Sequence, residues 1–178
     1  FTLIDITHAI QPFNYPQAAY VCRNALKQFP PFTFHIILVN LFDKSPDQLL
    51  LAYHRDQYIL CADNGLLTMI LEENPEMVIG LPLPAGAIRN TLTCSAVMGK
   101  AIQQLQSGLS LQQIGIPDVS IVEKNHLQPM LSDNWIEGQI IFIDNFENII
   151  VNITREQFEQ QRKSRNFRIV FKRDEVID

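Results

Sequence analysis

Cysteine is scarce in this sequence. Only Cys22, Cys61 and Cys94 occur, and they lie far apart within apolar stretches. An odd number of widely spaced cysteines argues against a disulfide framework or a zinc site and is typical of a reducing compartment, so we expect a cytoplasmic protein. Cys94, near the start of a predicted helix, is interpreted as packing rather than as a nucleophile, because buried inert cysteines are far commoner.

Long apolar runs and an excess of basic charge are also missing. No apolar run reaches the roughly 18 residues of a membrane span. No charged leader precedes an apolar core, so neither a membrane segment nor a signal peptide is expected. Fourteen Lys and Arg stand against 19 Asp and Glu, a net charge of −5, and this balance does not favour a nucleic-acid partner.

Phosphate-binding loops and metal-ligand spacings are absent as well. The turn Asp63-Asn64-Gly65 stands alone before a short helix, so neither a P-loop nor a dinucleotide fingerprint is present. The four histidines show no ligand spacing with one another or with cysteine; they are His8, His35, His54 and His126. We therefore expect no metal and no cofactor.

The sequence does contain alternating strand-like and helix-like segments. Apolar runs predict strands over Phe1–Ile6, Thr33–Leu41, Leu49–Tyr53 and Gln57–Ala62. Helical spacing and end signals predict helices over Pro16–Gln28, Leu66–Leu71 and Thr91–Ser107, the last ended by Gly108. The nearly continuous apolar run at Thr33–Leu41 favours a sheet covered on both faces. This order of elements predicts a three-layer α/β domain.

The residue composition changes after residue 115. A polar stretch leads into β-rich segments at Ile136–Ile153 and Asn166–Phe171, and Thr154 with Gln157 fits a capping box that opens a short helix between them. We place the domain boundary between residues 115 and 130. The α/β domain is assigned to residues 1–117, and a small β-rich domain, expected to be incomplete, to residues 118–178.

One polar patch separates two apolar runs in the segment IFIDNFENIIVNIT, residues 141–154. The patch is Asp144-Asn145-Phe146-Glu147-Asn148. Asn and Asp are turn formers, so the patch can simply close a β-hairpin. A turn does not require an aromatic at its centre, however, and Phe146, beside an Asp and an Asn, could stack on a flat heterocycle while the polar groups read its edge. The residues alone leave both readings open.

Several short stretches, in order along nearly the whole chain, together resemble one family. They are Ile4–Ile10 (IDITHAI) with Pro12-Phe13, Ala18–Tyr20, Phe29-Pro30, Asp63–Thr68 (DNGLLT), and Ile143–Asn148 (IDNFEN) with Asn152-Ile153. Their order and spacing resemble the S-adenosylmethionine hydrolases, also called hydroxide adenosyltransferases. These enzymes are relatives of the fluorinating and chlorinating enzymes that attack the same substrate at C5′.

The resemblance implies a fold, an assembly and a ligand. The fold would be an N-terminal three-layer α/β/α domain followed by a C-terminal β-barrel-like domain. The assembly would be a homotrimer that holds a small adenosyl ligand between the first domain of one subunit and the second domain of the next. In that arrangement Asn148 would bond the adenine edge, Phe146 would lie against the ring, Asp144 would face the methionine ammonium, and Phe13 would line the same pocket.

The sequence departs from the family where water is activated. Family hydrolases use an Asp, an Arg and a His from two further motifs. Counting back without gaps from Asp63 and from Gly108 places Asn40 at the Asp position, Asp47 at the Arg position and Thr93 at the His position. Two other signatures are absent from the printed chain: an upstream Thr-Asp-Phe-Gly stretch and a Ser- and Gly-containing stretch near the family's C-terminus. Missing ends would explain those two absences but not the three interior replacements.

Three hypotheses about function follow. The protein still cleaves S-adenosylmethionine to adenosine and methionine, because sulfonium is a good leaving group and an orienting site can retain some rate. Alternatively, it binds S-adenosylmethionine or adenosine without turnover. In the third hypothesis it is a structural subunit without a ligand. Asn40 discriminates among them, because Asn keeps its hydrogen bonding but cannot act as a carboxylate base.

Overall fold

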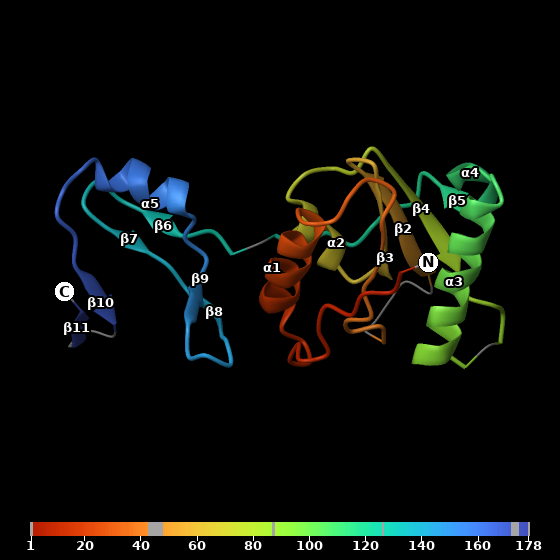
Figure 1. Ribbon diagram of the computed structural model, residues 1–178, viewed down its shortest axis with the longest axis horizontal. Coiled ribbons are helices and arrows are strands. Elements are labelled where there is room, and N and C mark those ends of the chain that lie inside the picture. Colours follow the sequence, from red (N-terminus) through yellow and green to blue (C-terminus); the bar gives the residue numbers. More distant parts are fainter. Residues whose placement is uncertain (1, 43–47, 87, 126, 172–174, 178) are drawn as a thin grey trace. The chain divides into compact units, whose positions relative to one another are not determined.

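The computed structural model divides into two compact units, Phe1–His126 and Leu127–Asp178 (Figure 1). It describes residues 2–42, 48–86, 88–125, 127–171 and 175–177. The division comes later than the boundary predicted between residues 117 and 118. The reason is that the segment after residue 117 packs on the first unit: Val119 and Ile121 contact its core, and the Val122 N–H donates to buried Asp63 Oδ1 at 2.8 Å.

A five-stranded mixed sheet with the order β1-β3-β2-β4-β5 forms the centre of the first unit. Its strands are β1 (Phe34–Ile36), β2 (Gln48–His54), β3 (Gln57–Ala62), β4 (Met77–Pro82) and β5 (Ile116–Pro117). Strand β1 runs parallel to β3. The other pairs, β2 with β3, β2 with β4 and β4 with β5, are antiparallel. The carboxyl ends of β1 and β3 therefore lie at the same end of the sheet.

Helices cover both faces of this sheet, as Figure 1 shows. On one face, α1 (Tyr15–Leu26) and α2 (Leu66–Leu71) pack on a core that contains Leu50, Ile59 and Cys61. On the other face, α3 (Thr91–Gln106) and α4 (Leu111–Ile114) pack on a second core. Alternate residues of β2 and β3 supply the two cores because successive strand side chains point to opposite faces. The predicted three-layer α/β/α arrangement is present in this unit.

The local predictions were confirmed where a segment has strong signals of its own. Strands β2 and β3 and helices α1, α2 and α3 lie within a few residues of the predicted bounds, and Gly108, with φ +92°, follows the end of α3. Cys94 is fully buried in the second core, which confirms that it packs. Strands β4 and β5 and helix α4 were missed.

Two strand predictions were wrong. Phe1 lies outside the described residues, and residues 2–6 form no strand: Leu3 is 93% exposed. The run Thr33–Leu41 forms a strand only over β1, and Ile36 and Leu38 are exposed rather than covered on both faces. Both differences have the same physical reason. Strand β1 lies at the edge of the sheet, and no described strand pairs with its outer side. Residues 2–6 therefore have no strand partner, and the residues after β1 are not covered on both faces.

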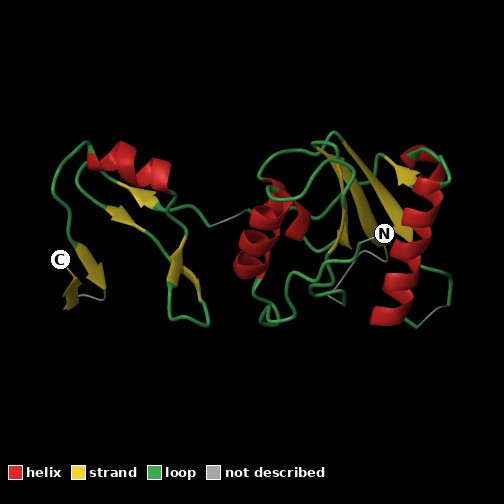
Figure 2. Cartoon of the chain, in the orientation of Figure 1, coloured by secondary structure: helices red, strands yellow, loops and turns green. Residues whose placement is uncertain are grey.

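The second unit is built from short antiparallel pairs and one helix (Figure 2). The pairs are β6 (Met130–Leu131) with β7 (Ile136–Glu137), β8 (Ile140–Ile143) with β9 (Ile149–Val151), and β10 (Ile169–Phe171) with β11 (Glu175–Ile177). Helix α5 (Arg155–Arg162) begins with the predicted capping box of Thr154 and Gln157. These described strands form three separate two-stranded sheets, so a barrel remains a prediction. Of the helices in the described segments, none has the length and apolarity needed to cross a bilayer.

Candidate functional site

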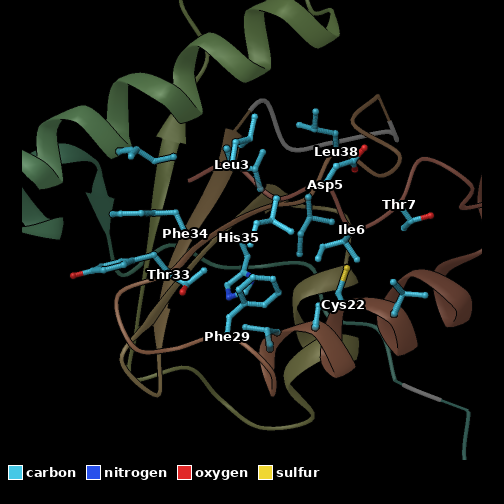
Figure 3. Close-up of a pocket in the computed structure, with 18 of the residues that line it drawn as sticks. Leu3, Asp5, Ile6, Thr7, Cys22, Phe29, Thr33, Phe34, His35 and Leu38 are labelled. Atoms are coloured by element: carbon cyan, nitrogen blue, oxygen red, sulfur yellow. The ribbon is translucent and has the colours of Figure 1, made fainter. Parts of the chain in front are cut away.

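A cavity of about 1440 Å³ opens in the first unit beside the edge strand β1 (Figure 3). The cavity is lined by residues 2–8 and 10–12, one face of α1, the segment 29–40 and the C-terminal half of α3. Most of its wall is apolar, with side chains such as Leu3, Ile6, Phe29, Phe34 and Leu38. This wall suits the apolar body of a ligand, and the ligand's polar groups would need specific partners.

The buried polar groups of this wall are neutral. His35 packs edge-to-face on Phe29, with ring centroids 5.7 Å apart, and its Nε2 is buried without a hydrogen-bond partner among the described residues. Burial lowers the pKa of His35, so the imidazole is neutral near pH 7. Burial also raises the pKa of the Cys22 thiol to about 11. Cys22 is therefore protonated and is not a nucleophile at neutral pH.

Asn40 lies at the end of the cavity where β1 and β3 have their carboxyl ends. Its backbone adopts a positive φ of +49°, a conformation that Asn tolerates better than most residues. Its side-chain Oδ1 accepts a hydrogen bond from the Phe13 N–H at 3.1 Å. Its Nδ2 is buried and has no partner in the part of the chain that the structure describes. Asn40 therefore keeps an unused donor at the edge of the sheet where α/β proteins commonly bind ligands.

The Asn40–Phe13 bond joins two predicted site residues that are 27 positions apart. Phe13 also has a positive φ, +61°, and its side chain is 71% exposed. The hydrogen bond to Asn40 fixes the Phe13 backbone, and the exposed Phe13 ring is available to lie against a ligand. Asp47, the third predicted residue of this region, lies outside the described residues.

Asn64 binds the backbone of the Asn40 segment. The sequence analysis did not predict it as a site residue. Its Nδ2 donates to the carbonyl oxygens of Val39 at 3.0 Å and Asn40 at 3.1 Å. Its Oδ1 accepts from the Leu66 N–H at 3.1 Å. The turn Asp63-Asn64-Gly65 was predicted only as the entry to α2. The neighbourhood of Asn64 and Asn40 follows from the parallel pairing of β1 and β3, which local sequence does not display.

Thr93 has a structural role at the start of α3. Its N–H donates to the side chain of the N-cap residue Asn90 at 2.9 Å, and its hydroxyl donates to the Ile88 carbonyl at 3.0 Å. No hydrogen bond between described residues joins Thr93 to Asn40 or Phe13. The structure thus pairs Asn40 with Phe13 and leaves Thr93 in a helix cap.

The patch at residues 144–148 closes the β8–β9 hairpin, which confirms the turn reading. Asp144 Oδ1 accepts the N–H groups of Phe146 at 2.8 Å and Asn148 at 2.9 Å, and its Oδ2 accepts from Asn148 Nδ2 at 2.9 Å. These bonds, first the one from the Asn148 side chain, hold the pKa of Asp144 below its ordinary value. Glu147 completes the turn with φ +64°.

The same turn leaves a candidate ligand surface exposed. Phe146 is 87% exposed at the hairpin tip. Asn148 uses its Nδ2 on Asp144, and its Oδ1 has no hydrogen bond to another described residue. Such an oxygen can accept from the exocyclic amine of a purine while the neighbouring ring stacks on it. Turn and ligand surface are therefore compatible, and the ligand role of the patch stays a prediction.

A protein family matches more than half of the chain. Residues 1–115 match the family described as "SAM hydroxide adenosyltransferase N-terminal domain". A curated relative from Methanocaldococcus jannaschii, named (R)-S-adenosyl-L-methionine hydrolase, is 24% identical over 156 residues, which cover 87% of this chain and 55% of the relative.

Solved structures show the same fold. An uncharacterized conserved protein from Thermotoga maritima superposes with a TM-score of 0.73 and 25% identity, over 94% of this chain and 65% of that one. A conserved hypothetical protein from Thermus thermophilus gives a TM-score of 0.61, also at 25% identity, over 84% of this chain and 59% of that one. The chain thus spans between about half and two thirds of the length of the proteins it matches.

Proposed function

Because the chain belongs to the SAM hydroxide adenosyltransferase family, we propose that it binds an adenosyl ligand, S-adenosylmethionine or adenosine, with its water-activating step weakened. The family and the name of the curated relative support an adenosyl ligand. The reduced turnover is argued from the residues of this chain. The free cysteines are in keeping with the cytoplasm as its compartment.

The observation that carries this proposal is the state of the Asn40 side chain. An amide at this position cannot take a proton from water as a carboxylate does. Its buried and unused Nδ2 nevertheless costs free energy until it meets an acceptor, such as a ligand hydroxyl or carboxylate. The position therefore suits binding better than base catalysis.

The hairpin supplies the second half of the proposed site. Phe146 would stack on adenine, and Asn148 Oδ1 would accept from its amine. Asp144 already accepts three hydrogen bonds within the turn, so its contact with a methionine ammonium would have to use the lone pairs that remain. As in the resemblance above, the hairpin would act on the first unit of a neighbouring subunit in a homotrimer.

Calorimetric titration with adenosine and with S-adenosylmethionine tests the binding. Asn40→Ala removes the buried donor, and we expect it to weaken binding by about 1 to 3 kcal/mol, the usual cost of leaving a buried polar group unpaired. Asn24→Ala, an exposed position on α1 outside the cavity, is the matched control and should leave affinity unchanged. Absence of binding by the wild-type protein would contradict the proposal.

The hairpin has its own test in the same titration. Asn148→Ala is expected to weaken adenosine binding by about 1 to 3 kcal/mol. Asn145→Ala is the control, since Asn145 is an asparagine of the same turn without a side-chain hydrogen bond to another described residue. If Asn148→Ala and Asn145→Ala bind adenosine with equal affinity, the patch is a turn without a ligand role.

Turnover is measured by chromatographic detection of adenosine released from S-adenosylmethionine. General-base help is commonly worth 10² to 10⁴ in rate, so we expect hydrolysis at least about 100-fold slower than in a relative with intact motifs. The triple variant Asn40→Asp, Asp47→Arg, Thr93→His should recover part of the rate. Recovery will be incomplete because Thr93→His also removes a helix-cap hydroxyl.

Two alternatives remain distinguishable from this proposal. Release of adenosine at an ordinary enzymatic rate of around 1 per second would make the protein an active S-adenosylmethionine hydrolase. Failure to bind either ligand, in a protein that still assembles, would favour a non-catalytic structural subunit. The buried free donor of Asn40 weighs against this last reading, because a site without ligand duty gains nothing from an unpaired polar group.

A further inference from the structure

Asn64 occupies a junction of three chain segments. It follows β3, its Oδ1 accepts the Leu66 N–H at the start of α2, and its Nδ2 donates to two consecutive carbonyls of the loop after β1. Only 4% of its surface is exposed. The bond to Leu66 serves the entry to α2, whereas the other two, which also satisfy the buried Nδ2, reach a different segment. Those two bonds are what tie the turn to the Asn40 segment.

The Asn40 segment has an uncommon backbone conformation that surrounding contacts help to fix. Its φ of +49° lies in the left-handed region, which Asn tolerates better than most residues other than glycine. The bond from Asn64 Nδ2 falls on the carbonyl of Asn40 itself. The direction of the Asn40 side chain, and hence its bond to Phe13, depends on that backbone conformation.

We infer that Asn64 is a positioning residue, which holds the Asn40 backbone so that one amide anchors Phe13 and presents its free Nδ2 to the ligand. The relay runs from Asn64 Nδ2 to the Asn40 carbonyl, and from Asn40 Oδ1 to the Phe13 N–H. Asn64 is not among the described residues that line the cavity, so it would act through Asn40 and not by touching the ligand. This inference rests on the proposed adenosyl ligand for its binding effect, and on the protein alone for its structural effect.

A double-mutant cycle measures whether Asn64 acts through Asn40. Asn64→Asp keeps the acceptor for Leu66 and removes both donations. In the wild-type background we expect it to weaken adenosine binding about tenfold, the effect of a lost hydrogen bond on the fixed segment. In the Asn40→Ala background the same substitution should have little effect. An equal loss in both backgrounds would overturn the inference, because a general structural defect does not require Asn40.

Hydrogen exchange of the Phe13 amide gives a readout that needs no ligand. In the wild type this N–H is bonded to Asn40, and Asn64→Asp should increase its exchange rate at least about tenfold. The amides of Leu50 and Leu60, in the middle of β2 and β3, should keep their protection. Unchanged exchange at Phe13, or faster exchange throughout the sheet, would contradict the relay.

A second variant covers the case in which Asn64→Asp does not fold. Asn64→Ser keeps a hydroxyl that can accept from Leu66, and it is too short to reach the two carbonyls. The same amide and the same cycle are then measured. If the wild type binds no adenosine while Phe13 exchange responds as expected, the proposed function fails and the positioning relay stands. If adenosine binds and Phe13 exchange does not respond, the relay alone fails.

Discussion

Asparagine side chains organise both candidate sites because they can serve a turn and a ligand at the same time. Asn40 tolerates a positive φ and still offers one acceptor and two donors. Asn148 uses its amide nitrogen inside the hairpin turn and keeps its oxygen free of bonds to other described residues. At both places a turn former also has the chemistry of a binding residue. The sequence alone therefore could not decide between the turn and the ligand surface at residues 144–148.

Asp144 gives the first prediction at this scale, a loosening of the hairpin in acid. Its folded pKa lies below its ordinary value of 3.8 because Asn148 and two backbone N–H groups bond the carboxylate. Its stabilising contribution is therefore complete above the unfolded pKa and is lost as the pH falls from about 4 through the lower folded pKa. We expect the amide resonances of Phe146 and Asn148 to shift in that window, measured by NMR.

Asp144→Asn provides the control for this titration. An amide keeps an acceptor for the backbone N–H groups but carries no charge to lose, so the acid transition of Phe146 and Asn148 should disappear. A wild-type midpoint at or above 3.8 would show that the carboxylate is not held by these bonds.

At the scale of the elements, the backbone of β4 approaches Gly115, just before β5, so closely that a side chain there has no room. A Cβ atom built there would lie 2.5 Å from the Gly80 carbonyl oxygen of β4 and 2.8 Å from a methyl group of Ile79. A backbone carbonyl in a ladder cannot move aside easily. We expect Gly115→Ala to lower the free energy of unfolding by about 1 to 3 kcal/mol, as overpacking of a core does. Urea unfolding followed by circular dichroism measures this change.

Gly99 provides the matched control within α3. A Cβ atom there meets nothing within 4 Å, and glycine in a helix interior costs roughly 0.5 to 1 kcal/mol relative to alanine. Gly99→Ala should therefore raise the free energy of unfolding while Gly115→Ala lowers it. The same sign for both variants would show that backbone approach at β4 and β5 does not limit this part of the fold.

The elements also show what local sequence can and cannot predict. Helix α2 was predicted with its correct bounds because the turn before it and its apolar residues are adjacent in the chain. Residues 2–6 were predicted as a strand from their composition, yet a strand needs a neighbour to bond, and they have none among the described residues. Strand β4, with Gly80 and Pro82, lacks the continuous apolar run that predicted β2. The Asn40–Phe13 bond depends on tertiary approach, and only the family resemblance grouped those residues.

For the whole molecule, the decisive feature is that the second unit has no buried residue among those whose burial is described, 127–171. Many of its large apolar side chains are exposed, among them Leu131, Trp135, Ile143, Phe167 and Val170. Isolated two-stranded pairs are marginally stable in water, and a unit without a core gains little from the hydrophobic effect. The unit therefore needs a covering surface, and the proposed homotrimer would supply one from another copy of the chain.

Assembly is the last prediction. Light scattering at micromolar concentration should return three times 20.4 kDa, or about 61 kDa. Leu131→Glu combined with Val170→Glu places charges on the exposed apolar surface of the second unit, and we expect it to shift the mass toward that of a single chain, because burying an unpaired charge at an interface is costly. Lys100→Glu, on the exposed side of α3, changes charge without touching that surface and should leave the mass unchanged. A wild-type chain that stays monomeric would remove the neighbouring subunit from the proposed site, and adenosine binding by that monomer would then have to arise from Asn40, Phe13 and the cavity of the first unit alone.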